Sequence, residues 1–455
     1  MIHMFTSKQS ISFLAFFVFL ISCQKETVVI NTTVERPYSF QRSTKVSIQD
    51  IISFSDSCSY YGYTKSNTSN IISIDPILHE ADTVMYLVNY KEDVWEVVSA
   101  DIRAPRVLIS GKTEGMSIDQ LYSNPTQSYY MDELAKSLLK IASQPEDGID
   151  EAFFTEDNWH DLIGVQQGTR DWSEWHLYRT EFLESYVVYE HGHLVTTKWG
   201  QDSVWRSRMP MKSTGVGHCP TGCVPVAVAQ TLYFLYEKFG FNHPIYGISA
   251  TWAHPSTDST YVMLGSSNTV FPNQSLSSDY WSQLPKTQSD DVSPDYFNIV
   301  STLMLNIGFY LPAKYYDYQT SSGVQLIPNL LSSRYSVSSL YCSPINFDIV
   351  LSQIHERGVP CILGIRDSDD HGHAVIADGA KRVVSLYRKY YVRYDTNGNV
   401  NYMTTVEPQY SNYVCINWGW SGARDDSPVW YNVSSSWYEY NVFQKLVYDI
   451  YSDEE

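Results

Sequence analysis

Basic residues are scarce in this sequence. The 455-residue chain has 31 lysines and arginines against 50 aspartates and glutamates, which gives a formal net charge of −19 at pH 7. A protein that binds nucleic acid across a broad face needs clustered basic side chains to contact the phosphates. The composition therefore argues against a nucleic-acid partner.

The apolar run at the N-terminus, Ile11–Ile21, is too short to span a bilayer comfortably. It follows Lys8 and leads into Ser22 and Cys23, a pattern typical of a signal peptide whose end resembles a bacterial lipobox. We therefore expect lipidation of Cys23, a membrane anchor at the bacterial cell envelope, and sorting to the outer membrane, or extracellular release after processing. The alternative is an ordinary signal peptide with a chance cysteine.

Cysteine is infrequent, with seven in the whole chain. Cys219 and Cys223 lie four positions apart, but no second pair follows at the spacing of a zinc site. We therefore expect neither a metal nor a cofactor. A disulfide between Cys219 and Cys223 remains a competing hypothesis, because it would remove both thiols.

Composition and periodicity divide the chain into a signal peptide (1–22), a polar tether (23–45), a strand-rich region with a linker (46–185) and a second domain (186–455). Alternating residues predict a hairpin at 83–100, and apolar spacing predicts a helix at 130–142.

In the second domain, the pattern predicts helices first and then a group of strands. The helices are expected from Cys223 onward, at 296–308 and at 347–358, and the strands at 359–365, 373–377, 383–394 and 413–418. A helix-led half followed by a strand-rich half indicates an α+β fold.

Turn-forming residues precede a run of small apolar residues around Cys223. Thr221 is a plausible cap and Pro225 suits a first helical turn, so a helix should begin at or just before Cys223. The positive end of a helix dipole can lower a thiol pKa from about 8.5 to roughly 3.5–7.5, which gives a thiolate nucleophile. The alternative is a buried cysteine that acts as a small hydrophobe.

A thiolate nucleophile needs a base that moves its proton, a group that orients the base, and donors for the oxyanion. His373 begins an apolar strand and is the candidate base, and His371, two residues earlier, is its nearest rival. Asn417 can accept the imidazole N–H, and the indole of Trp418 can shield that bond from water. The amide of Gln201 can join the backbone N–H of the cysteine as an oxyanion donor.

These segments resemble the motifs of the streptopain family of papain-like cysteine peptidases. The matching segments are Thr221-Gly222-Cys223-Val224, Gly372-His373-Ala374-Val375-Ile376, Asn417-Trp418-Gly419-Trp420, and Trp199 with Gln201 upstream. The hairpin and following residues from Met85 to Arg103 resemble the inhibitory prodomain of that family.

The resemblance implies a papain-like catalytic domain, with a helix-led half and an antiparallel sheet half, preceded by a smaller α+β prodomain that inhibits it. Its implied site residues are the nucleophile Cys223, the general base and acid His373, the oxyanion donor Gln201, the orienting pair Asn417 and Trp418, and the substrate-cleft residues Gly372, Ser321 and Ser322. The implied function is a secreted endopeptidase, made as a zymogen, that acts on proteins or peptides.

Three departures from the family pattern stand near these motifs. Pro225 replaces the usual alanine, Gln201 is followed by a different segment that includes Trp205, and Ser421 interrupts the final glycine pair. We expect them to affect specificity more than mechanism. Two other functions stay open at this point: an inert surface-binding protein on a peptidase fold, and a cysteine–histidine amidase or transpeptidase for cell-wall peptides.

Overall fold

The structure is a computed structural model, and some segments of the sequence-based predictions lie outside the residues that it describes. It describes residues 26–28, 44–57, 70–123, 125–144, 175–253, 262–270, 280–366, 372–394, 400–421, 428–433 and 443–452. The signal peptide, Cys23, His371 and most of the tether therefore lie outside it. Within these ranges, no helix combines the length and the apolar character needed to cross a membrane.

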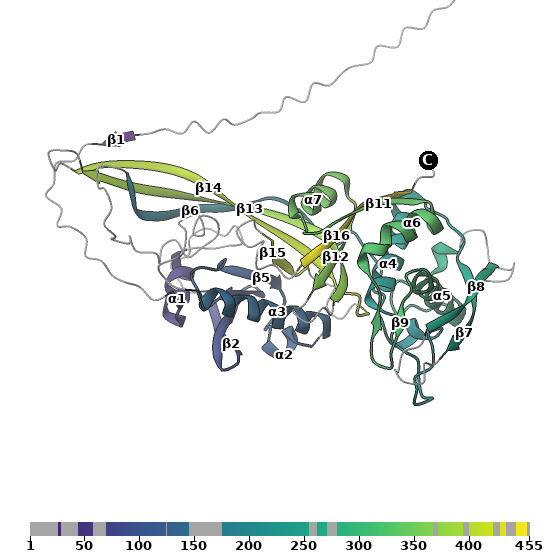
Figure 1. Cartoon of the computed structure of the whole chain (residues 1–455). Coiled ribbons are helices and arrows are strands. Elements are labelled where there is room, and N and C mark those ends of the chain that lie inside the picture. Colours follow the sequence, from purple (N-terminus) through teal and green to yellow (C-terminus); the bar gives the residue numbers. More distant parts are fainter. Residues whose placement is uncertain are drawn as a thin grey trace, which may run out of the picture.

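The chain forms helices and strands in mixed order, with long strands concentrated toward its C-terminal half (Figure 1). The helices are α1 (Ile48–Ser57), α2 (Ile118–Leu121), α3 (Pro125–Ala142), α4 (Cys223–Phe239), α5 (Pro294–Tyr310), α6 (Ile327–Tyr335) and α7 (Phe347–Ser352). The first strands are β1 (Glu26–Val28), β2 (Ile71–His79), β3 (Asp82–Tyr90), β4 (Val94–Ser99), β5 (Val107–Lys112), β6 (His176–His191), β7 (Tyr246–Ala253) and β8 (Val262–Val270). The remaining strands are β9 (Lys314–Tyr315), β10 (Thr320–Ser321), β11 (Val337–Cys342), β12 (Cys361–Arg366), β13 (Gly372–Tyr394), β14 (Val400–Asn417), β15 (Trp430–Asn432) and β16 (Phe443–Ser452).

One large sheet contains strands from both the N-terminal and the C-terminal parts of the chain. Its strand order is β11-β16-β12-β13-β14-β15-β5-β4-β3-β2, with β6 paired to β13 and β1 paired to β14. The link between the N-terminal strands and the C-terminal strands is the antiparallel pair β15–β5, in which Trp430 lies opposite Ser110 and Tyr431 opposite Ile109. The α+β fold is therefore confirmed, with the two sheet portions hydrogen-bonded into one.

The N-terminal hairpin is confirmed as β3 and β4. Glu92 and Asp93 both have positive φ in the connecting turn, and such backbone angles match the right-handed twist of the paired strands. The helix expected at 130–142 is α3, which begins five residues earlier and packs on the sheet. Its inward-facing residues Tyr130, Leu134 and Leu138 are buried.

The strands after His373 are longer than predicted. The segments expected at 373–377 and 383–394 form one strand, β13, which pairs along β14 from Tyr394 back to Ile376. The two strands and β6 extend together away from the helices in Figure 1. Strand β6 runs through the predicted boundary between residues 185 and 186, so the chain has no structural break there. The division into domains stays a prediction.

Two of the three buried clusters among the described residues pack helices against the sheet. The first surrounds α4 and α5 and includes Val226, Leu232 and Leu303. The second lies between α3 and the sheet and combines N-terminal residues such as Trp95 with C-terminal residues such as Trp418. The two sheet portions thus share one core as well as one hydrogen-bonded sheet.

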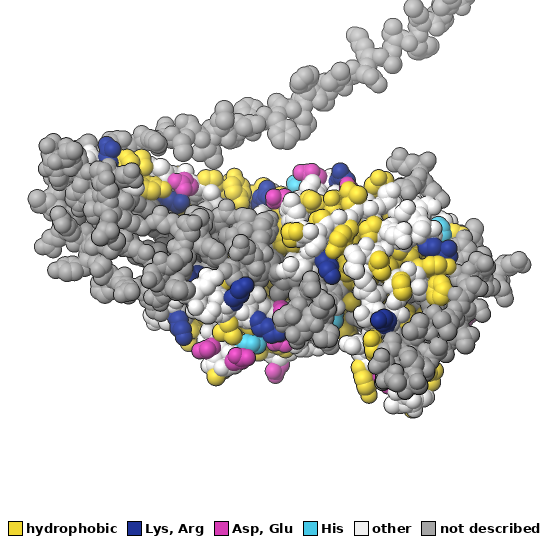
Figure 2. Space-filling model, in the orientation of Figure 1, with side chains coloured by type: hydrophobic (Ala, Val, Ile, Leu, Met, Phe, Trp, Pro, Cys, Tyr) yellow, Lys and Arg dark blue, Asp and Glu magenta, His cyan; other side chains and the backbone are white. Residues whose placement is uncertain are grey.

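On the face drawn in Figure 2, the described lysines and arginines lie scattered among apolar and uncharged side chains. On β13, Lys381 forms an ion pair with Glu190, Arg388 with Glu181 and Lys389 with Glu407. The described part of this face therefore offers no broad basic surface.

Candidate active site

Helix α4 begins at Cys223, as the sequence predicts. The preceding residue, Gly222, has a φ of 101°, and a Cβ there would lie 2.9 Å from the Thr320 side chain. Only glycine fits both constraints without strain. The thiols of Cys219 and Cys223 are both free, so the structure does not support the disulfide that competed with a nucleophilic role.

The fold brings Cys223 to the strand that carries His373. Cys223 packs in the same cluster as Ala374, the residue that follows His373 on β13, and the backbone N–H of Ala374 acts on the thiol to lower its pKa. The two residues are 150 positions apart in sequence, and the packing of α4 against β13 closes that separation. The structure thus joins the two segments that the cysteine-peptidase hypothesis requires to meet.

The expectation of a lowered pKa at Cys223 is wrong for this conformation. Burial raises the pKa of the Cys223 thiol, and hydrogen bonds from the backbone N–H groups of Ala374, Val224 and Cys223 offset only part of that rise. Burial destabilises the thiolate more than the backbone N–H groups at the N-terminus of α4 stabilise it. In the described arrangement burial therefore favours the neutral thiol of Cys223.

Gln201 lies close to the start of α4. Its backbone carbonyl accepts the N–H of Thr221 at 2.9 Å, two residues before Cys223. Its side-chain Nε2 is buried and has no hydrogen-bond partner among the described residues. A buried amide N–H normally finds an acceptor, so this donor is suited to a group supplied by a substrate.

The interactions of Asn417 differ from the predicted ones. Its Nδ2 donates to the Thr197 carbonyl at 3.3 Å, and its amide pairs with the amide of Gln230 at 3.4 Å in both directions. Its Oδ1 also accepts the backbone N–H of Gly419 at 3.0 Å. Asn417 therefore joins β14 to α4 in this conformation, and its side chain is engaged by groups other than His373.

Two tyrosines of α3 cover the predicted histidine and tryptophan. The ring of Tyr129 meets the ring of His373 edge to face, with centroids 5.1 Å apart. The ring of Tyr130 contacts Trp418 in the same way at 5.7 Å. Trp418 also donates its indole N–H to the hydroxyl of Tyr431 at 3.2 Å. The N-terminal part of the chain thus packs directly on this side of the candidate site.

The predicted substrate-cleft residues flank the same region. Ser321 ends strand β10, whose Thr320 donates its hydroxyl to the carbonyl of Pro220 at 2.5 Å, and Ser322 follows directly. Gly372 is exposed at the start of β13, where a Cβ would lie 3.0 Å from the Ile365 carbonyl oxygen. The two serines therefore lie near the helix start, and Gly372 lies beside the histidine.

Two departures from the family pattern contact each other. The indole N–H of Trp205 donates to Oγ of Ser421 at 3.1 Å. Ser421 also sits against Gly200, where a Cβ would lie only 2.2 Å from that oxygen. The unusual serine and the unusual segment after Gln201 are thus parts of one contact, which holds the loop carrying Gln201 against the end of β14.

Sequence reasoning missed two contributors to this site. Gln230 accepts the backbone N–H of Trp199 at 3.2 Å and the Thr197 hydroxyl at 3.1 Å while it pairs with Asn417. Its place in the α4 motif next to Ala229 was visible, but a buried glutamine in an apolar helix was not singled out. The other is Tyr129, whose partner is distant in sequence and leaves no local signal.

The comparisons with known proteins agree with this geometry. The model of the Peptidase C10 family matches residues 199–431, just over half of the chain, and the chain therefore belongs to that family of cysteine-type peptidases. This is the streptopain family, so the resemblance and the predicted enzyme class are confirmed. Comparison with curated proteins gives no match.

A solved structure supports the papain-like fold. A fragment of prointerpain A from Prevotella intermedia matches with a TM-score of 0.51 and 19% identity, over 84% of this chain and 99% of that one. The active wild-type interpain A cysteine protease from the same organism matches at 23% identity over 58% of this chain and 97% of that one, with a TM-score of 0.38. The first of these shows that the fold extends over the N-terminal region as well as the peptidase region.

Proposed function

We propose that this cysteine peptidase is a lipid-anchored endopeptidase of the bacterial cell envelope, synthesised as a zymogen, with Cys223 as nucleophile and His373 as general base and acid. The observation that carries the proposal is the packing of α4 on β13, which brings Cys223 against Ala374, the residue next to His373. It sets the first residue of α4 against the strand that bears the histidine. The family supplies the reaction class.

The chemistry follows from the groups at this junction. The Cys223 thiolate attacks the carbonyl carbon of a peptide bond, and the resulting oxyanion accepts hydrogen bonds from the Cys223 N–H and the Gln201 amide. His373, protonated by the thiol, passes that proton to the departing amine and leaves a thioester. Water then attacks the thioester with His373 as base, which releases the acid and restores the thiol.

The N-terminal region is proposed to act as the inhibitor of its own peptidase domain. Tyr129 packs on the imidazole of His373, and Tyr130 packs on Trp418. These contacts bury the side of the site where a base must approach the thiol and a substrate. The raised pKa of Cys223 supports the same latent state, because a neutral thiol is a poor nucleophile.

The proposal of a lipid anchor rests on the sequence alone. The segment that ends at Cys23 resembles a lipobox, and two acyl chains on one cysteine would bind a membrane stably where a single chain would not. Residues 24–45 would then serve as a tether. Labelling with radioactive palmitate in a bacterial host should mark the parent chain and not the Cys23→Ser variant, and equal labelling of both would refute the anchor.

Incubation of the purified precursor tests the catalytic assignment. We expect the parent chain to shorten, with a new N-terminus between about residues 145 and 195, and to hydrolyse casein. The Cys223→Ala variant should do neither, with casein turnover reduced at least 10³-fold. Cys342→Ser is the matched control, since that half-buried thiol lies on β11, away from the start of α4. Conversion of Cys223→Ala at the parental rate would refute the assignment.

A further inference from the structure

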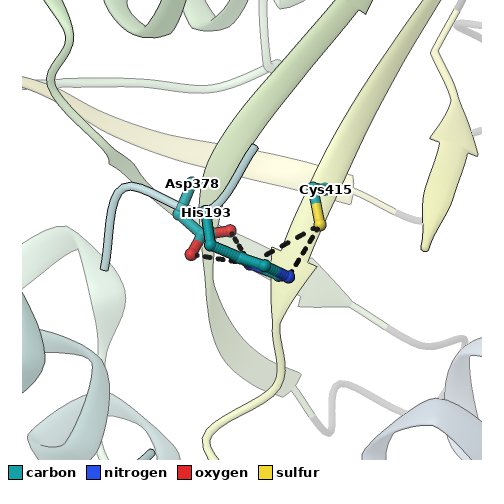
Figure 3. Close-up of side chains that lie close together, drawn as sticks. All are labelled: His193, Asp378 and Cys415. Carbon is teal, nitrogen blue, oxygen red and sulfur yellow. Dashed lines mark hydrogen bonds and ion pairs between the residues drawn. The ribbon is translucent and has the colours of Figure 1, made fainter. Parts of the chain in front are cut away.

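A second cysteine–histidine assembly lies away from α4. His193, Asp378 and Cys415 turn their side chains toward one another (Figure 3), and their ligand atoms all lie within 4.8 Å. His193 follows the end of β6, Asp378 lies on β13 and Cys415 lies on β14. Three separate segments therefore bring a nitrogen, an oxygen and a sulfur to one point.

The spacing of these atoms suits a tetrahedral metal ion. Nδ1 of His193 lies 3.2 Å from each carboxylate oxygen of Asp378 and 3.7 Å from Sγ of Cys415. Zinc forms bonds of about 2.0–2.2 Å to nitrogen and oxygen and of about 2.3 Å to sulfur. In tetrahedral geometry these bonds separate a nitrogen ligand from an oxygen ligand by roughly 3.4 Å, and a nitrogen ligand from a sulfur ligand by roughly 3.6 Å. Sγ lies equally far from Nε2, at 3.7 Å, so both ring nitrogens of His193 are near the sulfur.

Charge and burial favour the same ion. Asp378 is fully buried and Cys415 nearly so, while the side chain of His193 keeps 23% of its surface exposed. A divalent cation with one carboxylate and one thiolate has no net charge, which suits a site that excludes water on two sides. The imidazole on the open side leaves room for water as a fourth ligand.

The backbone around Asp378 brings its side chain close to Cys415 on the neighbouring strand. A register shift between Ala377 and Gly379 makes Asp378 the extra residue of a β-bulge in the β13–β14 pair. Bulges re-aim single side chains. At Gly379 a Cβ would lie 2.7 Å from Cβ of Cys415, so only glycine lets the two strands approach here. Burial raises the pKa of Asp378, and hydrogen bonds from His193 and the N–H of Val195 oppose that rise, as a cation would more strongly.

We propose that His193, Asp378 and Cys415 bind one zinc ion, which fastens the start of the peptidase region to the sheet. On binding, the thiol loses its proton to solvent and the imidazole keeps one proton on the nitrogen that does not contact the metal. The ion links residue 193 to β13, the strand that carries His373. The proposal concerns a site distinct from Cys223 and does not depend on the peptidase mechanism.

Titration with Co²⁺ alone tests this site directly. A cysteine thiolate bound to Co²⁺ gives a charge-transfer absorption band, and tetrahedral Co²⁺ gives intense absorption bands in the visible range. The protein to use is the full-length chain with Cys223→Ala, which removes the other reactive thiol and prevents self-processing. We expect one equivalent of Co²⁺ to bind with both spectral features, and Zn²⁺ to displace it and raise the thermal unfolding midpoint by several degrees.

Variants assign the ligands. Cys415→Ser on that background should abolish the thiolate band and weaken Zn²⁺ binding by roughly 100-fold or more, whereas the control Cys342→Ser should retain both. His193→Gln changes a partly exposed residue outside the strands and should weaken binding at least about tenfold, which gives a second test if Cys415→Ser does not fold. Absence of a thiolate band in excess Co²⁺, or an undiminished band in Cys415→Ser, would overturn the proposal and leave an Asp–His ion pair beside a thiol.

Discussion

The two sides of the candidate peptidase site are packed by different parts of the chain. On the α4 side, Cys223 and Gln201 are held within the peptidase region, through the carbonyl of Gln201 and the contact between Trp205 and Ser421. On the sheet side, His373 is covered by Tyr129 from α3, which precedes the peptidase region. The α4 side is therefore held by contacts within residues 199–431, and the contact from the N-terminal region lies on the histidine side.

The largest expected effect concerns the α4 side. Gln201→Ala removes a buried N–H that has no described acceptor, and in the proposed mechanism this donor binds the developing oxyanion. We expect kcat of the processed enzyme to fall by about 10²–10³-fold with little change in KM, because the interaction forms in the transition state.

Steady-state kinetics on a peptide substrate measures this effect. Alkylation of Cys223 by iodoacetamide is the control, since it needs no oxyanion and should proceed at the parental rate. A change confined to KM would show that Gln201 binds substrate and does not stabilise the oxyanion.

A smaller effect is expected on the sheet side. Tyr129→Ala removes the aromatic contact with His373, which is worth about 0.5–1.5 kcal/mol, so the precursor should process itself roughly 2–10 times faster. Tyr129→Phe is the matched control, because the Tyr129 hydroxyl has no hydrogen-bond partner among the described residues and the ring remains. Gel electrophoresis over time follows the conversion, and equal rates for Tyr129→Ala and the parent would remove Tyr129 from the inhibitory contact.

The pH dependence of Cys223 alkylation should distinguish the intact precursor from the protein that lacks the N-terminal region. Burial raises the pKa of Cys223 above its ordinary value of 9.0, so alkylation in the intact precursor should be slow at neutral pH and rise only above that value. The raised pKa adds stability that is fully present below the ordinary pKa and is lost as pH rises through the folded value.

Removal of the N-terminal region should shift this alkylation profile to lower pH. Mass spectrometry of the peptide that contains Cys223 provides the measurement, and the thiol of Cys342 serves as an internal reference. Full reactivity of Cys223 at pH 7 in the intact precursor would contradict the latent thiol.

The smallest effect concerns the loop that carries Gln201. Ser421→Ala removes the hydrogen bond from the Trp205 indole and should lower the free energy of unfolding by about 0.5–1.5 kcal/mol. Urea unfolding of this variant, of Trp205→Phe and of the double variant completes a cycle. Additive losses would show that the two departures from the family pattern are energetically independent.

The sequence predicted the α4 side of the site well because its information is local. Turn residues, a helix-compatible proline and an apolar run lie within a few positions of Cys223, and the helix begins at that residue. The hairpin of β3 and β4 is marked just as locally by its turn.

The missed features depend on contacts between distant segments. Tyr129 and His373 are far apart in sequence, so no periodicity predicts that they meet. The pKa of Cys223 was predicted from the helix terminus alone, whereas burial by distant residues determines its direction. Cysteine spacing showed no metal pattern because His193, Asp378 and Cys415 come from three segments.

The pairing of β15 with β5 has a consequence for the processing proposed above. Both of its register pairs, Trp430 with Ser110 and Tyr431 with Ile109, join the peptidase region to residues that processing would separate from it. Departure of those residues would leave β15 as a bare sheet edge with free N–H and C=O groups beside two large aromatic residues. Such an edge accepts an added strand, so the matured protein would gain a surface where an extended polypeptide could dock along the backbone.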